Sequence, residues 1–446
     1  MATKATTTTP ARKARPAVLW ICTTAGEPWT SLAPATESSS GGLADTGERD
    51  QTWRGFGGCF NELGWKALQP LTPTARDRVL RSLFAPRQDS CRFRHCRVPI
   101  GANDYAESWY SHNETAGDFA MKHFSIERDQ KHLLPYLRAA LAIQPETTLF
   151  ASPWSPPTWM KFPQAYNHGT LVGTDQNLAA YALYLLRFVQ AYRAEGLPVT
   201  AIHVQNEPNS DQKFPSCLWT GAQMRDFIRD HLGPRFSRAK LDCEIWAGTI
   251  ERGDYNAWGN TIFSDAACRR LVTGMSFQWA GRGQVQRMRM SWPEVRLIQS
   301  EGECGSGSNS WGHAMHTFDL LWHYLTNGVE AYTYWNMVLP PGGTSTWGWK
   351  QNAMITVDPE TRRVTYNPEF YVMKHLSRFV APGARRICLR GPWTGNSLAF
   401  ENPDGTVVVA VQNPHADARD FAFQGATGAV GGCLPPSSIN TFVRST

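Results

Sequence analysis

Two glutamates, each at the end of an apolar run, are the residues of this sequence best placed to do chemistry together. Glu207 follows the apolar, β-branched residues 199–204 and precedes Pro208, and Glu301 ends the run 295–301 before Gly302. Because a proline cannot donate to a sheet ladder, the chain must leave the sheet just after Glu207. We therefore expect both carboxylates at the C-terminal ends of buried strands, where barrel enzymes hold their reactive groups.

A pair of carboxyl groups at such a rim is what glycoside hydrolysis requires. One group protonates the leaving oxygen, and the other attacks the sugar carbon or activates a water. Either glutamate alone is more simply explained as a solvated strand end. Two of them, each closing a hydrophobic strand, favour the functional interpretation.

The composition indicates a globular protein with more than one hydrophobic core. A chain of 446 residues exceeds the usual size of one core, so we expect one large domain and a smaller one. Its 18 tryptophans suit stacking on sugar rings, although a Trp-rich core is the alternative. The net charge of +6 has no dense Lys/Arg block in the body, which argues against a nucleic-acid partner. No apolar run is long enough to predict a transmembrane segment.

Cysteine usage and the first residues bear on the compartment. The ten cysteines contain no Cys-x-x-Cys pair, and several fall in predicted strands, so we expect free, buried thiols and a reducing environment. Residues 1–16 are basic, lack acids and lack an apolar segment, which predicts a disordered tail and no secretory signal. Together these features predict a cytoplasmic location.

Strand and helix patterns alternate through the middle of the chain. Helices are predicted over residues 74–84, 126–143, 175–195 (with Asp175 as its cap), 221–232, 257–270, 311–326 and 367–379. Strands are predicted over residues 55–60, 91–100, 147–152, 199–207, 243–249, 272–279, 295–301 and 329–336. Eight such alternations predict an α/β fold, a closed parallel (β/α)8 TIM barrel over residues 52–380.

The two ends of the chain have a different, all-β pattern. Residues 17–51 hold short strand candidates and turns, and residues 381–446 hold short alternating segments with a hairpin turn at Asn402-Pro-Asp-Gly405. Because the termini of a barrel come close together, we expect both segments to build one flanking β-sandwich domain.

Five motifs, in order along the chain, resemble those of glycoside hydrolase family 30, the group that includes the glucosylceramidases. The resemblance covers about residues 53–386. The motifs are Gly55-Phe-Gly-Gly-Cys-Phe-Asn-Glu62, Arg97-Val-Pro-Ile-Gly, Ala151-Ser-Pro-Trp-Ser-Pro-Pro-Thr-Trp-Met-Lys161, Asn206-Glu207-Pro208 and Tyr334-Trp-Asn336.

The resemblance implies retaining hydrolysis of β-glycosides, with Glu207 as acid/base and Glu301 as nucleophile. Arg97 would hold Glu301 ionised, Asn206 would bind the sugar 2-OH, and Glu62 would bind hydroxyls at the non-reducing end. No cofactor is implied. No metal site is predicted either, because His313 and His316 are more simply a solvent-facing pair than zinc ligands.

The remaining candidate substrate-binding residues come from the same strand ends and loops. Trp154 and Trp335 would wall the pocket, with a place in the core as the alternative. Asn103 and Asp104 would add polar contacts, and Trp349, with Trp347 and Asn352, would shape the leaving-group side. Where glucosylceramidases read His-Trp-Tyr, this chain reads Gln278-Trp279-Ala280, so either another donor serves Glu301 or the sugar preference differs.

Three functions remain open at this point. The first is an exo-acting β-glycosidase with glucosyl, xylosyl or fucosyl specificity, whose substrate is a small-molecule or oligosaccharide β-glycoside. The second is an endo-acting β-1,6-glucanase, which needs an open cleft. The third is a non-catalytic carbohydrate-binding protein on the same fold, although such a protein has no need of both Glu207 and Glu301.

Overall fold

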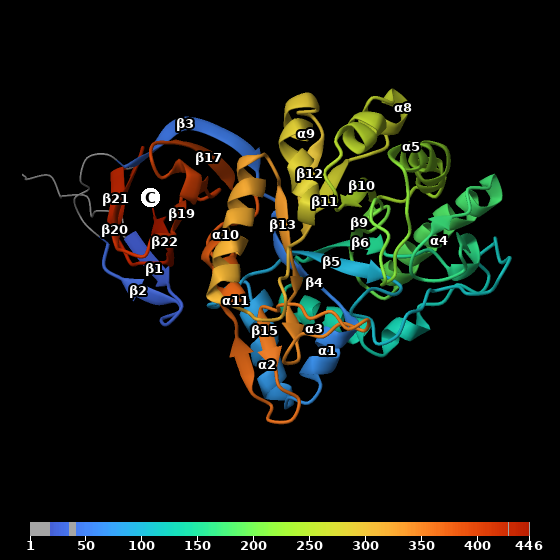
Figure 1. The fold of residues 1–446 in the computed structure, drawn as a ribbon, viewed down its shortest axis with the longest axis horizontal. Coiled ribbons are helices and arrows are strands. Elements are labelled where there is room, and N and C mark those ends of the chain that lie inside the picture. The colour runs from blue at the N-terminus through green and yellow to red at the C-terminus, as the bar shows by residue number, and fades with distance from the viewer. Residues whose placement is uncertain (1–17, 35–41, 427, 446) are drawn as a thin grey trace, which may run out of the picture.

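The computed structural model describes residues 18–34, 42–426 and 428–445, so the predicted basic tail at 1–16 lies outside the described residues. Figure 1 shows a barrel surrounded by helices, with a β domain at its side in which the first and last strands of the chain lie next to each other. The architecture is the predicted α/β barrel with a flanking β-sandwich.

The barrel is closed by eight parallel strands, one for each predicted strand. Their interior and exterior faces are both buried, which explains the continuous apolar runs in the sequence. In chain order the strands are β4 (Gly55–Cys59), β5 (His95–Ile100), β6 (Thr148–Pro153), β9 (Val199–His203), β10 (Glu244–Ile250), β11 (Gly274–Gln278), β12 (Arg296–Glu301) and β13 (Ala331–Asn336).

Helices cover the outside of the barrel, and each predicted helix has a counterpart in the structure. The main ones are α1 (Glu62–Leu68), α2 (Pro73–Phe84), α3 (Leu133–Ile143), α4 (Asp175–Ala194), α5 (Gly221–Asp226), α6 (Gly233–Arg238), α7 (Thr261–Phe263), α8 (Ala266–Arg269), α9 (Val285–Ser291), α10 (Trp311–Thr326) and α11 (Pro368–Ser377). Short 3₁₀ or π turns are η1 (Glu127–Gln130), η2 (Thr158–Met160), η3 (Phe227–Leu232), η4 (Asn256–Asn260), η5 (Trp279–Gln284) and η6 (Thr394–Asn396).

Four helical details differ from the sequence prediction, and one is that the helix predicted over residues 221–232 continues through α6 to Arg238. The cap of α4 is Thr174, whose hydroxyl accepts from the Asn177 backbone N–H, so the prediction of Asp175 as the cap was wrong. Helices α1 and α9 were not predicted. Both have only seven residues, too few for a 3.6-residue apolar repeat to be recognised.

The flanking sheet joins strands from both ends of the chain, as predicted. Its order is β2-β1-β22-β19-β18-β17-β3-β20-β21, and the Asn402–Gly405 turn connects β18 to β19. The Gly-rich strand β21 was not predicted. The strands are β1 (Val18–Thr23), β2 (Thr30–Leu32), β3 (Leu43–Thr52), β17 (Arg385–Arg390), β18 (Ser397–Glu401), β19 (Val407–Asn413), β20 (Arg419–Gly425), β21 (Gly428–Leu434) and β22 (Ser438–Arg444). Two minor sheets pair β7 (Lys161–Phe162) with β8 (Thr170–Leu171), and β14 (Val338–Leu339) with β15 (Ile355–Val357) and β16 (Val364–Tyr366).

A buried histidine ties the sandwich to the last barrel helix. His375 of α11 places its two ring nitrogens 2.9 Å from the hydroxyls of Thr441 and Thr23, which come from opposite ends of the chain. Burial lowers the pKa of His375 to about 3, so the ring stays neutral and acts as a polar link between the two domains.

The ten cysteines are all free and seven of them are buried, as the sequence predicted. Among the described residues, no helix is long and apolar enough to cross a membrane.

The glycines of the first motif let two barrel strands approach each other closely. A Cβ added to Gly57 of β4 would lie 1.8 Å from the backbone oxygen of His95 in the neighbouring strand β5. The backbone cannot move aside without disturbing the barrel, so this glycine is required by packing.

We expect Gly57→Ala to destabilise the protein by about 3 kcal/mol, because the new methyl group overpacks two strand backbones. Gly395→Ala is the matched control, since an added Cβ there has no neighbour within 4 Å. Chemical denaturation of both variants measures the difference. Equal stabilities would contradict the close approach of β4 and β5.

Candidate active site

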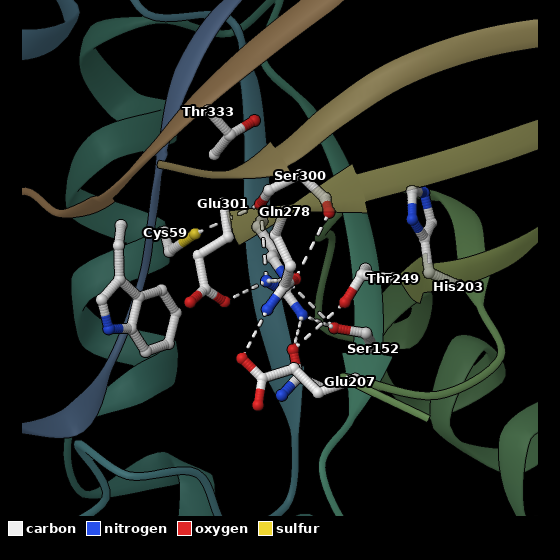
Figure 2. A network of polar contacts seen from close by, with 12 residues as sticks. Cys59, Ser152, His203, Glu207, Thr249, Gln278, Ser300, Glu301 and Thr333 are labelled. Carbon is white, nitrogen blue, oxygen red and sulfur yellow. Dashed lines mark hydrogen bonds and ion pairs between the residues drawn. The ribbon is translucent and has the colours of Figure 1, made fainter. Parts of the chain in front are cut away.

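Glu207 and Glu301 meet at the C-terminal end of the barrel. Glu301 is the last residue of β12, and Glu207 lies in the loop just after β9. Figure 2 shows their carboxyl groups turned into the same space, and each residue is only 5% exposed. The glutamates that the sequence singled out are therefore brought together in a buried setting.

Arg97 of β5 supplies the positive charge beside Glu301. Its Nη1 donates to Glu301 Oε2 at 2.7 Å, its Nη2 donates to Asn206 Oδ1 at 2.7 Å, and its Nε donates to Ser152 Oγ at 2.9 Å. The guanidinium is fully buried, and it lies 4.4 Å from the centre of the Trp154 ring. Contacts on all sides fix its orientation, so the ion pair with Glu301 is preorganised.

Trp279 is the second donor to Glu301. Its indole Nε1 donates to Glu301 Oε1 at 3.2 Å, so each oxygen of this carboxylate has its own donor. The backbone of Trp279 has φ +46°, a left-handed conformation that is strained for a bulky residue. This strain turns the indole toward Glu301 and provides the donor that the sequence left open at Ala280.

Two glutamine amides, and no cation of the described residues, contact the carboxyl of Glu207. Gln278 Nε2 donates to Oε1 at 2.9 Å and Gln212 Nε2 donates to Oε2 at 3.3 Å. Gln278 also accepts from Arg97 Nη1 at 3.4 Å, which connects the surroundings of Glu207 to those of Glu301.

These unequal surroundings separate the protonation states of the two carboxyl groups. Burial, followed by the nearby charge of Glu301, raises the pKa of Glu207 well above its usual range. Burial also raises the pKa of Glu301, but Arg97 and the Trp279 hydrogen bond oppose this effect by favouring the charged form. The shared proton therefore resides on Glu207 and the negative charge on Glu301.

Two tryptophans form the wall next to this pair. Trp154 and Trp335 stack with ring centres 5.5 Å apart, and the Trp335 indole donates to Gln351 Oε1 at 2.9 Å. Asn206 Oδ1 accepts from Arg97 and from the Thr249 hydroxyl, so its amide nitrogen is the group left to meet a ligand.

Asp104 and Asn103 bring unpaired polar atoms to the same place. Asp104 Oδ1 and Asn103 Nδ2 are buried and have no hydrogen-bond partner among the described residues. Burial, followed by the charge of Glu301, raises the pKa of Asp104 to about 8. Both atoms are free to make a further hydrogen bond, so they are candidates for contacts with the hydroxyl groups of a ligand.

A pocket of about 460 Å³ opens outward from Glu207, within the range of small-molecule sites. Aromatic rings form a row along it. The ring centres of Trp279 and Trp349 are 5.7 Å apart, those of Trp349 and Trp347 are 5.5 Å apart, and those of Trp347 and Phe214 are 5.4 Å apart. Gln212, Phe214 and Glu251 also line it but were not predicted, because they lie in loops without a periodic pattern. The pocket is lined by Glu207, Gln212, Phe214, Glu251, Trp279, Trp347, Gly348 and Trp349, so it has room for a group next to the carboxyl of Glu207.

The contacts of Glu62 do not support the expected role in sugar binding. Its carboxylate accepts from Arg128 at 3.3 and 3.1 Å and from the backbone N–H of Glu107 at 2.7 Å. Both oxygens are thus used to hold the loop after β5 against α1. Asp104, which has an unpaired oxygen, lies close enough to Glu301 for the charge of Glu301 to raise its pKa.

The fold and this constellation define a glycoside hydrolase. The "Glycosyl hydrolase family 30 TIM-barrel domain" matches residues 53–380, and the "Glycosyl hydrolase family 30 beta sandwich domain" matches residues 383–442. The chain therefore belongs to glycoside hydrolase family 30.

Known relatives carry two kinds of name. The lysosomal acid glucosylceramidase of Mus musculus is 29% identical over 391 residues, covering 81% of this chain and 75% of the relative. An endo-1,6-beta-D-glucanase of Neurospora crassa is 26% identical over 428 residues, covering 89% and 86%. Among solved structures, SrfJ from Salmonella typhimurium has a TM-score of 0.88 at 25% identity, covering 96% of this chain and 99% of that chain.

We expect Asp104→Asn to stabilise the protein increasingly as the pH rises. An unfolded aspartate has a pKa of about 3.9, so between about pH 4 and pH 8 the folded protein holds a proton that the unfolded chain has released. The free energy of unfolding of the wild type therefore falls as the pH rises over this range. The side-chain amide of the Asp104→Asn variant does not titrate, so the variant does not show this fall. The gain should grow by on the order of 4 kcal/mol between pH 4.5 and 8, measured by chemical denaturation.

The exposed Asp254→Asn serves as the control for removing one negative charge. A gain from Asp104→Asn that is the same at every pH would show that Asp104 titrates normally in the folded protein.

Proposed function

We propose that this protein is a retaining, exo-acting β-glycosidase in which Glu207 is the general acid/base and Glu301 the nucleophile. The observation that carries the proposal is the asymmetry of the two carboxyl groups. Glu301 has two donors, one of which is the buried cation Arg97, whereas Glu207 has neutral amides and an adjacent negative charge. This distribution suits an ionised nucleophile beside a protonated acid.

In the first step, Glu301 attacks the anomeric carbon while Glu207 donates its proton to the leaving oxygen. The glycosidic bond breaks as a covalent glycosyl–Glu301 ester forms. The ester removes the negative charge that had raised the pKa of Glu207. Glu207, now ionised, can accept a proton from water, and the resulting attack of water releases the sugar with its original configuration.

The remaining groups support binding of the sugar ring. The free amide nitrogen of Asn206 is suited to bind the 2-OH, a contact that strengthens in an oxocarbenium-like transition state. The unpaired atoms of Asp104 and Asn103 suit hydroxyl groups further round the ring. Trp154 and Trp335 offer apolar surface to its carbon-bound hydrogens.

The loop after β13 favours exo action. Its residues bond to the loop after β5: the Tyr105 hydroxyl donates to the Gly343 carbonyl at 2.6 Å, and the Thr346 N–H donates to the Asp104 carbonyl at 3.0 Å. These bonds close the site on the side of Asp104, while the aromatic pocket beside Glu207 is open. A site with one open side suits a single glycosyl unit with its leaving group outside. Because the names of the relatives refer to glucosyl substrates, β-glucosyl is the proposed unit, ahead of xylosyl and fucosyl.

An endo-acting β-1,6-glucanase is the second candidate. The Neurospora crassa enzyme with this name aligns over more of the chain than the mouse glucosylceramidase does. This activity would require the β13 and β5 loops to separate and admit a chain beyond Asp104.

The proposed preference for a β-glucosyl unit predicts that p-nitrophenyl β-glucoside is hydrolysed faster than the xyloside and the fucoside. On a linear β-1,6-glucan the enzyme should release glucose only, from the chain end, because the closed side holds one unit. Chromatography of the early products measures this. Early release of longer oligosaccharides would favour the endo-acting alternative.

Glu301→Ala should lower turnover by several orders of magnitude, since no covalent intermediate can form. Added azide should restore part of the activity and yield a glycosyl azide of inverted configuration, identified by NMR. Near wild-type turnover would remove Glu301 from the mechanism.

Glu207→Ala is the matched comparison. It should lose less activity on aryl glycosides, whose leaving groups need no proton, than on alkyl glycosides. Equal losses on both kinds of substrate would contradict the acid role.

A further inference from the structure

We propose that Glu251 selects the leaving group by its charge, so that the open pocket accepts neutral or cationic leaving groups and rejects anionic ones. This inference rests on the proposed function, because it assigns the pocket beside Glu207 to the leaving group. It adds a specificity-determining residue that does not take part in the bond-breaking steps.

The structure holds Glu251 in place at the pocket. The residue follows directly on the last residue of β10 and lines the pocket together with Glu207. Its backbone N–H donates to Asn209 Oδ1 at 3.3 Å, and Asn209 Nδ2 donates to the carbonyl of Arg252 at 3.0 Å. These bonds tie the β10 loop to the loop that carries Glu207. The side chain is only 18% exposed, so its charge is partly shielded from water.

No lysine or arginine is among the described residues that line the pocket. Glu207 and Glu251 are its two acids, and because Glu207 holds the proton, Glu251 is the charged residue of the lining; its charge contributes to the raised pKa of Glu207. Of the nearby cations, two are engaged elsewhere and two are exposed. Arg97 is bonded to Glu301 and Asn206, Arg282 pairs with Glu303, and Lys213 and Lys350 are exposed and outside the pocket lining.

Arg252 does not cancel the charge of Glu251. Its Nε lies 3.0 Å from Glu251 Oε2, but its side chain is 63% exposed and is therefore well hydrated. Ion pairs with such an exposed partner are weak, and salt screens them further. An anionic leaving group would thus meet the negative charge of Glu251.

The aromatic rings act in the same direction. Trp279, Trp349, Trp347 and Phe214 form a continuous row along the pocket. The faces of aromatic rings carry negative potential, so they attract cations and the C–H groups of sugars and disfavour anions. The carboxylate and the rings together favour a neutral sugar or a cationic leaving group with an apolar face.

Three phenyl β-glycosides test this selection, each carrying the sugar that the enzyme hydrolyses best. Their phenyl rings bear a meta acetamido, carboxylate or trimethylammonium group. We compare kcat/KM for the wild type and Glu251→Gln at the pH optimum of each, at low ionic strength. Because each comparison uses the same leaving group, differences in its intrinsic reactivity cancel.

Relative to the acetamido substrate, Glu251→Gln should raise kcat/KM for the carboxylate substrate roughly fivefold to tenfold. It should lower kcat/KM for the trimethylammonium substrate by a similar factor. Glu251→Lys should enlarge both changes, and 0.5 M salt should reduce them. Asp254→Asn is the control, because it removes a carboxylate three residues away that does not line the pocket. Its ratios should match those of the wild type.

Three results would overturn the inference. If both Glu251 variants keep wild-type ratios while hydrolysing the neutral substrate well, Glu251 does not select charge and the proposed function stands. If Asp254→Asn shifts the ratios as much as Glu251→Gln does, the selection arises from the net charge of the protein surface and not from Glu251. A wild type that hydrolyses none of the three substrates would overturn the proposed function and the inference together.

Discussion

The ion pair between Arg97 and Glu301 is the interaction on which the rest of the site depends. Two carboxyl groups buried side by side cannot both be ionised unless a cation compensates one of them. Arg97 is placed asymmetrically, at 2.7 Å from Glu301 and without a bond to Glu207 among the described contacts. This placement decides which glutamate carries the charge. Ser152, Asn206 and the Trp154 ring have the supporting task of keeping the guanidinium in one orientation.

The barrel explains why these groups converge. Parallel strands all end at one rim, so residues that are about a hundred positions apart in the chain, such as Arg97, Glu207 and Glu301, become neighbours. The rim also holds several unfavourable features. Glu207 and Trp279 have left-handed backbones, and Asp104 holds an unpaired oxygen in a buried position. The well-packed strands below stabilise the fold enough to tolerate these unfavourable features.

Most of the fold and the central pair could be predicted from the sequence, because buried parallel strands leave continuous apolar runs and breakers mark where they end. Thus Glu207, Glu301 and Arg97 were found from strand ends and motifs. The pocket wall was harder to predict. Gln212, Phe214 and Glu251 lie in irregular loops, whose course depends on contacts between distant segments such as Asn209 and Arg252. The contacts of Glu62 could not be predicted for a similar reason, since its partner Arg128 lies 66 positions away.

Trp279 belongs to two parts of the site at once, and this limits how the enzyme can change. Its indole nitrogen holds the carboxylate of Glu301, while its ring begins the aromatic row of the pocket. A substitution that reshapes the pocket at this position would also remove a hydrogen bond from Glu301, the proposed nucleophile. New substrate ranges are therefore more accessible through Phe214 and Trp347, at the far end of the row, than through the residue nearest the reaction. Natural variation and laboratory evolution for other leaving groups should accumulate at that outer end.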